Sequence, residues 1–106
     1  MITIEEFRKL ALSFQDATEE PHFDKASFRV NKKIFATFDE INNQAVVKLS
    51  PLDQSVFCSF DKAVMYPVSG TWGRQGWTVI ELDKVKKEML KDALKTAYHN
   101  LSAKKK

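Results

Sequence analysis

Apolar residues recur at helical spacing in the first part of the chain. Thr3 and Glu6 form a capping box at its start, in which each side chain satisfies a free backbone N–H of the first helical turn. The pattern predicts a helix over residues 4–14 with one buried face. The polar run over residues 16–20 and then Pro21 predict a break, because the residue before a proline avoids helical angles.

A second helical stripe lies near the other end of the chain. Its apolar residues repeat every three or four positions after Asp83, which stands where a helix cap is expected, and they predict a helix over residues 84–101. A shorter helix is expected after Ser50, because Ser50 suits the cap and Pro51 the first helical position. We expect this helix to end near residue 60.

Short segments rich in β-branched and aromatic residues occupy the middle of the chain. They predict strands at residues 26–30, 33–38, 44–49, 64–66 and 77–82. Asn31-Lys32 suits a two-residue turn between the first two strands, because asparagine tolerates positive φ. Residues 69–76 hold all three glycines and predict a loop with unusual backbone angles.

The two-residue turn also predicts how the first two strands pair. It places Phe28 opposite Phe35, so that both rings lie on one face of the hairpin. Ile34, Ala36 and Phe38 would then lie on the other face. Both faces of the sheet are therefore expected to carry apolar groups.

The order of these elements indicates the fold class. A helix, three strands, a short helix, two strands and a last helix predict an α+β domain. We expect an antiparallel sheet of about five strands, with the N- and C-terminal helices packed on one face. Residues 1–103 would form this single domain, followed by the basic tail of residues 104–106.

Charge and composition narrow the range of partners. The chain is 43% apolar and 29% charged, which is typical of a globular protein, and its net charge is +3. Residues 1–20 sum to −3, residues 21–80 to +2 and residues 81–103 to +1. The whole excess therefore lies in the lysine tail, and the neutral body predicts weak rather than strong attraction to nucleic acid.

Few residues could carry out chemistry. Cys58 is the single cysteine and lies in a short apolar helix, where a buried and inert thiol is expected. His22 is expected in a loop and His99 near a helix C-terminus, and the chain has no phosphate loop, dinucleotide fingerprint or nucleophile elbow. We expect a non-enzymatic protein with no catalytic residue, metal or cofactor. The acidic N-terminus and the lack of a long apolar run predict a cytoplasmic protein without a membrane partner.

Basic and aromatic residues gather at two predicted tips. The candidate nucleic-acid-binding residues are Arg29, Lys32 and Lys33 on the first tip, and Trp72, Arg74 and Gln75 on the second. Lysine and arginine contact phosphates, and an aromatic ring beside them can stack on a base or fill a protein pocket. Lysines are also common in hairpin turns, where they favour solubility.

The chain resembles the MmcQ/YjbR family over nearly its whole length. The segments that carry the resemblance are Pro21-His22-Phe23, Phe28-Arg29-Val30-Asn31-Lys32-Lys33-Ile34-Phe35-Ala36, Val47-Lys48-Leu49-Ser50-Pro51, Tyr66-Pro67-Val68, Trp72-Gly73-Arg74-Gln75-Gly76-Trp77 and Ala97-Tyr98. The resemblance implies a fold like that of the frataxin/CyaY group. It also implies DNA binding through a double wing, whose wings would be the two tips. The family has no agreed catalytic residues to transfer to this chain.

Three other functions remain open on the sequence. An apolar sheet face left uncovered by the helices would suit a protein-interaction or regulatory domain. The acids of residues 5–20 could bind a metal ion, as the frataxin-like fold suggests by analogy alone. An enzyme acting on a small molecule would need a site that no motif in the chain indicates.

Overall fold

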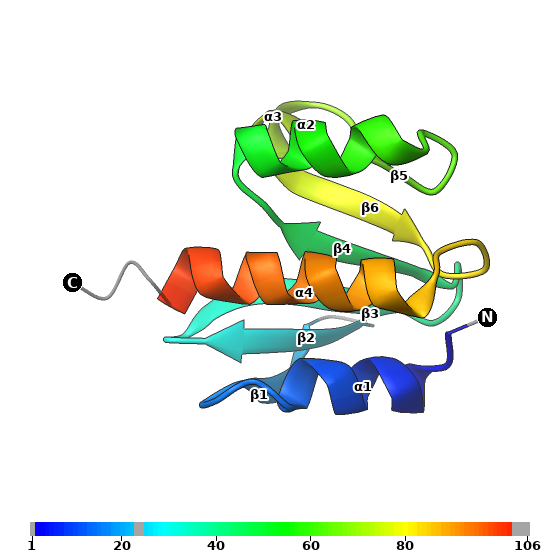
Figure 1. Ribbon diagram of the computed structural model, residues 1–106. Helices are drawn as coiled ribbons and strands as arrows, with labels where there is room; N and C mark the ends of the chain where they lie inside the picture. Colours follow the sequence, from blue (N-terminus) through cyan, green and yellow to red (C-terminus); the bar gives the residue numbers. More distant parts are fainter. Residues whose placement is uncertain (1, 23–24, 103–106) are drawn as a thin grey trace.

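The computed structural model describes residues 2–22 and 25–102, which form an open six-stranded antiparallel sheet and four helices (Figure 1). The helices are α1 (Ile4–Leu12), α2 (Pro51–Phe60), α3 (Thr71–Arg74) and α4 (Lys87–Ser102). The strands are β1 (Thr18–His22), β2 (Lys25–Val30), β3 (Lys33–Asp39), β4 (Gln44–Lys48), β5 (Met65–Pro67) and β6 (Trp77–Glu81). Their order across the sheet is β1-β2-β3-β4-β6-β5. The predicted α+β class is confirmed, with six strands where five were expected.

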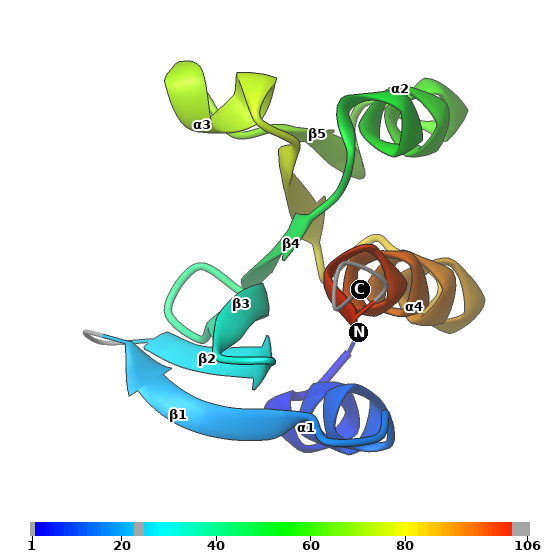
Figure 2. The ribbon, with the colours of Figure 1, turned by 90° about the vertical axis from the view of Figure 1, so that its left-hand side faces the viewer.

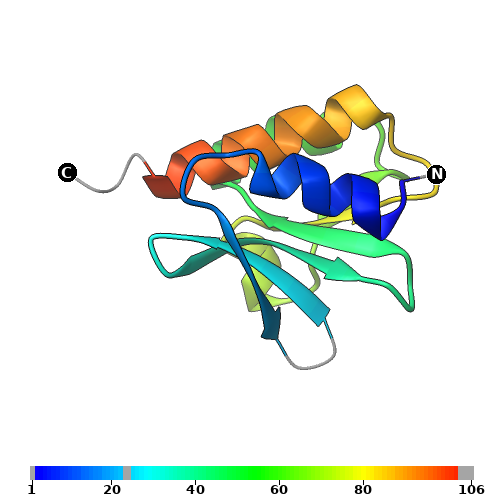
Figure 3. The same cartoon turned by 90° about the horizontal axis from the view of Figure 1, so that it is seen from below.

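Three helices lie on one side of the sheet. Figure 2 shows α1, α2 and α4 on this side and α3 on the other, and Figure 3 shows the same arrangement from below. The two terminal helices therefore pack on one face, as predicted. The core lies beneath them, and its largest fully buried side chains are Phe7, Phe28, Phe35, Leu49, Met65, Ile80, Leu82, Leu90 and Leu94.

A β-bulge between β2 and β3 changes the predicted pairing of the first hairpin. The pairs nearest the turn are as expected, but Phe28 lies opposite Ala36, and Phe35 is the extra residue. An extra residue resets the alternation of side chains along a strand. These three residues and Phe38 are all buried on the helix side, where the Phe7 ring lies 5.4 Å from Phe28 and 5.1 Å from Phe38. The prediction that separated them onto two faces was wrong.

The strand that was not predicted is β1. Thr18–His22 contains two glutamates and Pro21, residue types that are depleted in strands. It pairs with β2 alone, and an edge strand tolerates proline. Arg8 of α1 also holds it, because the guanidinium donates to both carboxylate oxygens of Glu19 at 2.6 and 3.0 Å. A tertiary contact thus stabilises a strand that local propensity disfavours.

Both terminal helices are shorter than predicted. α1 ends at Leu12, and Phe14 lies beyond it, where its ring stacks on Tyr98 of α4 at a centroid distance of 4.8 Å. α4 begins at Lys87, three residues later than expected, because the residues before it turn back to the carbonyl of Glu81. The predicted apolar residues do face the core. Some of them, such as Phe14 and Val85, lie just outside the helices, in adjoining segments that pack on the same core.

Candidate nucleic-acid interface

Two connections meet at one end of the sheet. Asn31-Lys32 joins β2 to β3, and α3 joins β5 to β6, which pair with each other. Between them β4 ends at Lys48, opposite Trp77 of β6. Figures 1 and 3 show this end beside the last turn of α4. The two predicted tips therefore lie at the same end of the sheet, with β4 between them. We call this end the basic end and define it as Lys32, Lys33, Lys48, Trp72, Arg74 and Gln75.

The first tip is a tight turn that presents two lysines. Asn31 has a φ of 54° and Lys32 a φ of 67°, the left-handed angles that a two-residue hairpin turn requires. The predicted turn is thus confirmed, and it includes a left-handed lysine as well as the expected asparagine. Lys32 and Lys33 are exposed, and neither takes part in an ion pair within the described part of the chain.

The second tip contains a short helix where a loop was expected. Thr71–Arg74 forms one helical turn between Gly70, with a φ of 80°, and Gly76, with a φ of 105°. A Cβ atom on Gly73 would lie 1.8 Å from the carbonyl oxygen of Val68, and one on Gly76 would meet the β4–α2 connection at 1.7 Å. Two of the three glycines are therefore needed for close backbone packing, which holds α3 firmly against the sheet.

A buried glutamine on α2 supports the second tip and was not predicted. Gln54 is only 9% exposed, and its Nε2 lies 2.9 Å from the carbonyl of Gly73, 3.1 Å from that of Trp77 and 3.2 Å from the Thr78 hydroxyl. Its two amide protons are shared among these three acceptors. The only sequence signal was a polar residue in a short helix that also carries Asp53, Ser55 and Ser59, and this does not reveal what Gln54 contacts.

Trp72 is the exposed aromatic residue of this surface. It is 62% exposed, while Trp77 beneath it is half-buried and meets it edge-to-face at 6.4 Å. Arg74 and Gln75 are exposed beside it on the same short segment. The Lys48 ammonium donates to the Gln75 carbonyl at 2.7 Å, which joins β4 to the end of α3. An accessible indole thus lies on a short segment that also carries Arg74 and that Lys48 holds at its end.

Arg29 is oriented differently from the other predicted site residues. Its Nε donates to the Ser27 hydroxyl at 3.2 Å, and its Nη1 lies 3.9 Å from the Glu20 carboxylate of β1. Its charge is therefore partly balanced at the β1–β2 pair. The other predicted residues lie at the basic end, together with Lys48, which was not predicted as a site residue.

The sheet face opposite α1 and α4 is less apolar than expected. Along its middle run Thr37, Val46 and Val79, which are half-buried and lie side by side through strand pairing. Toward the far end, the Tyr66 hydroxyl donates to Glu81. This hydrogen bond and partial burial raise the pKa of Tyr66. The large aromatic residues expected here lie on the helix side instead.

The candidate chemical groups are engaged in structure. Cys58 is partly buried on α2, and burial raises the pKa of its thiol, which disfavours the reactive thiolate. Glu6 completes the predicted capping box, and Glu19 binds Arg8. Within residues 2–22 and 25–102, no three histidine, cysteine or acidic side chains are grouped as metal ligands. Among the same residues, no helix is both long and apolar enough to cross a membrane.

Comparisons with known proteins agree with this fold. A crystal structure of the Deinococcus radiodurans protein DR2400, whose domain carries the family label DUF419, superposes with a TM-score of 0.84. The alignment covers 98% of this chain and 81% of that one, at 19% identity, so it shows a shared fold. No curated protein sequence matches the chain. The sequence profile of YjbR matches residues 12–100, and the chain therefore belongs to the YjbR family.

Proposed function

We propose that this protein is a non-enzymatic binding module that contacts DNA weakly through its basic end. The observation that supports this most directly is the exposed Trp72 beside Arg74, at the same end of the sheet as the turn that presents Lys32 and Lys33. These three cations have no ion-pair partner within the described residues, so they are available to a ligand. The neutral body of the chain limits the affinity, because few counterions are released on binding.

Each group has a distinct role in the proposed contact. Lys32, Lys33 and Arg74 bind phosphate oxygens, and the Trp72 indole stacks on a base. The Gln75 amide can hydrogen-bond a base edge or a sugar. Stacking requires a base whose face is accessible, and the proposal therefore favours single-stranded DNA over duplex.

The open sheet face is the weaker candidate. A protein-interaction surface was expected there because aromatic rings were predicted on both faces. Phe28 and Phe38 lie beneath the helices, and the residues in the middle of the open face are half-buried.

The test compares two variants that change the charge equally. Fluorescence anisotropy with labelled single-stranded and duplex DNA is measured at several salt concentrations, on a chain that ends at Ala103 so that the tail cannot contribute. One variant carries Lys32→Glu, Lys33→Glu and Arg74→Glu. Because each phosphate contact on a single strand contributes about 0.7 to the slope of log K against log salt, we expect the slope to fall by about 2. We expect the affinity to drop at least ~10-fold.

The matched control reverses three exposed lysines elsewhere, with Lys9→Glu, Lys91→Glu and Lys95→Glu. It should retain most of the binding. A Trp72→Ala variant should weaken single-strand binding more than duplex binding, by about 1–3 kcal/mol. Equal losses in the two charge variants would show a non-specific attraction, and unchanged binding by the first variant would rule out the basic end.

A further inference from the structure

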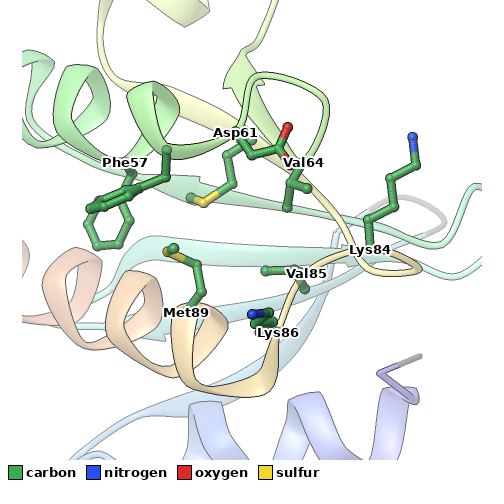
Figure 4. Close-up of a pocket in the computed structure, with 9 residues that line it drawn as sticks. Phe57, Asp61, Val64, Lys84, Val85, Lys86 and Met89 are labelled. Atoms are coloured by element: carbon green, nitrogen blue, oxygen red, sulfur yellow. The ribbon is translucent and has the colours of Figure 1, made fainter.

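A pocket opens between α2 and α4, where α4 begins and away from the basic end (Figures 1 and 4). α2 packs against β5 and α4 against β3 and β4, so the two helices cover different strands and leave a hollow between them. The pocket has a volume of about 260 Å³. Its apolar wall comes from both helices and the segments next to them, and consists of Phe57, Phe60, Val64, Met65, Val85 and Met89.

The apolar wall extends from buried side chains to exposed ones. Met65 is 1% exposed and Val85 8%, whereas Phe57 and Met89 are half-buried and Phe60 is 68% exposed. Figure 4 shows the side chains of Phe57 and Met89 directed toward each other across the pocket. The flexible thioethers of Met65 and Met89 adapt to the shape of whatever they contact. A concave apolar wall that water can reach is the usual form of a small-molecule site.

Two lysines lie at the mouth of this pocket. Lys84 and Lys86, in the connection before α4, both line it and are exposed. Neither has an ion-pair partner among residues 2–22 and 25–102. Asp61 is the acid among the described lining residues, and its carboxylate accepts a hydrogen bond from the Ala63 backbone N–H at 2.9 Å. The lining therefore carries one more positive charge than negative.

We propose that this pocket binds a small amphipathic carboxylate, whose apolar body lies against the wall and whose anionic group is held by Lys84 and Lys86. An uncharged apolar ligand would fill the pocket but leave both ammonium groups to water, whereas a carboxylate accepts their charge-assisted hydrogen bonds. A single ligand charge matches the single excess positive charge of the lining. The volume lies just below the roughly 300–1,000 Å³ of pockets for drug-sized ligands, so the ligand is small.

Octanoate is the probe, and octanamide, its uncharged counterpart of the same length, is the matched ligand control. Both are titrated into the full chain and followed by NMR. We expect a dissociation constant for octanoate on the order of 1 mM, because a small ligand in an open pocket makes few contacts. The methyl signals of Met65 and Met89 should shift, while the indole signal of Trp72 at the basic end remains in place. Octanamide should bind about 5-fold more weakly.

The role of the two lysines is tested by paired charge variants. Lys84→Gln with Lys86→Gln should weaken octanoate binding about 5-fold and leave octanamide binding unchanged. Lys91→Gln with Lys95→Gln removes the same charge from exposed positions of α4 outside the pocket and should leave both affinities unchanged. Equal losses in the two double variants would overturn the proposal, as would equal affinities of the native chain for octanoate and octanamide.

The role of the apolar wall is tested at its exposed rim. Phe60→Ser removes a ring that is 68% exposed and should weaken both ligands at least ~3-fold. Ile41→Ser is the control, because Ile41 is 82% exposed in the turn after β3, outside the pocket, and it should leave both affinities unchanged. Shifts that spread over the whole surface, or that persist undiminished in Phe60→Ser, would show attachment elsewhere and overturn the proposal. The absence of any shift at Met65 and Met89 with about 20 mM octanoate would also overturn it.

Discussion

The basic end and the corner formed by α1 and β1 use their charged residues in opposite ways. In the corner, Arg8 binds Glu19, with the shortest contact at 2.6 Å, and Lys87 lies 3.8 Å from Glu6. At the basic end, the lysines of the β2–β3 turn and Arg74 are exposed and have no ion pair within the described part of the chain. Charge holds secondary structure together in the corner, and it is available to a ligand at the basic end.

The two regions also differ in what fixes their backbone. The corner depends on side-chain contacts that join α1, β1 and α4. The basic end depends on glycines and on one buried amide, which hold α3 close to neighbouring backbone. We therefore expect substitutions that strain the backbone to destabilise the basic end most, and low pH to weaken the contacts of the corner.

The largest effect is expected from Gly76→Ala. The new Cβ would lie 1.7 Å from the Leu49 oxygen, at a φ of 105° that other residues rarely adopt. We expect the free energy of unfolding to fall by more than about 3 kcal/mol, measured by urea denaturation. Gly70→Ala is the matched control, because Gly70 has a φ of 80° but no atom within 4 Å of the added Cβ. It should cost about 1–3 kcal/mol, and an equal loss would show that conformational strain alone explains both.

A smaller effect is expected from Gln54→Leu. The substitution removes the Gln54 amide from the carbonyls of Gly73 and Trp77 at a buried site that water reaches poorly, and we expect a loss of about 2 kcal/mol. Tryptophan fluorescence should also change, because α3 carries Trp72. In the control, Gln44→Leu removes an amide from Glu81 at a half-buried site, where water can replace it, so the loss should be smaller. Equal losses would contradict a special role for Gln54 in positioning α3.

The sequence predicts much of this fold because its local signals agree with the tertiary structure. The Thr3–Glu6 capping box, the Asn31-Lys32 turn and the α2 start at Ser50 are all found as expected. These features depend on residues within a few positions of each other. The resemblance also supplied the YjbR family, which the profile match supports.

The unpredicted features depend on contacts between distant residues. β1 needs Arg8, and the bulge places the Phe35 ring against Phe14, which follows α1, and Tyr98 of α4. The contact of Gln54 with α3 joins residues 19 positions apart. Both basic tips could be located in the sequence. That they lie at the same end of the sheet follows only from the strand order. Lys48 was overlooked for this reason.

The smallest effect concerns the response of the corner to acid. The hydrogen bond from the Thr3 backbone, with a lesser contribution from Lys87, lowers the pKa of Glu6 below its usual value of 4.5. A carboxylate whose pKa is lower in the folded state adds stability above its unfolded pKa, and this stability is lost as the pH falls through the folded pKa. Below about pH 4.5, the backbone NMR signals of Thr3 and Glu6 should therefore shift as the cap weakens, while those of Lys32 and Arg74 remain steady. Glu6→Gln keeps a side-chain acceptor but cannot titrate, so it should remove the pH dependence at Thr3. If Thr3 still shifts over the same range in that variant, another carboxylate controls the corner, and the capping box is not its acid-sensitive element.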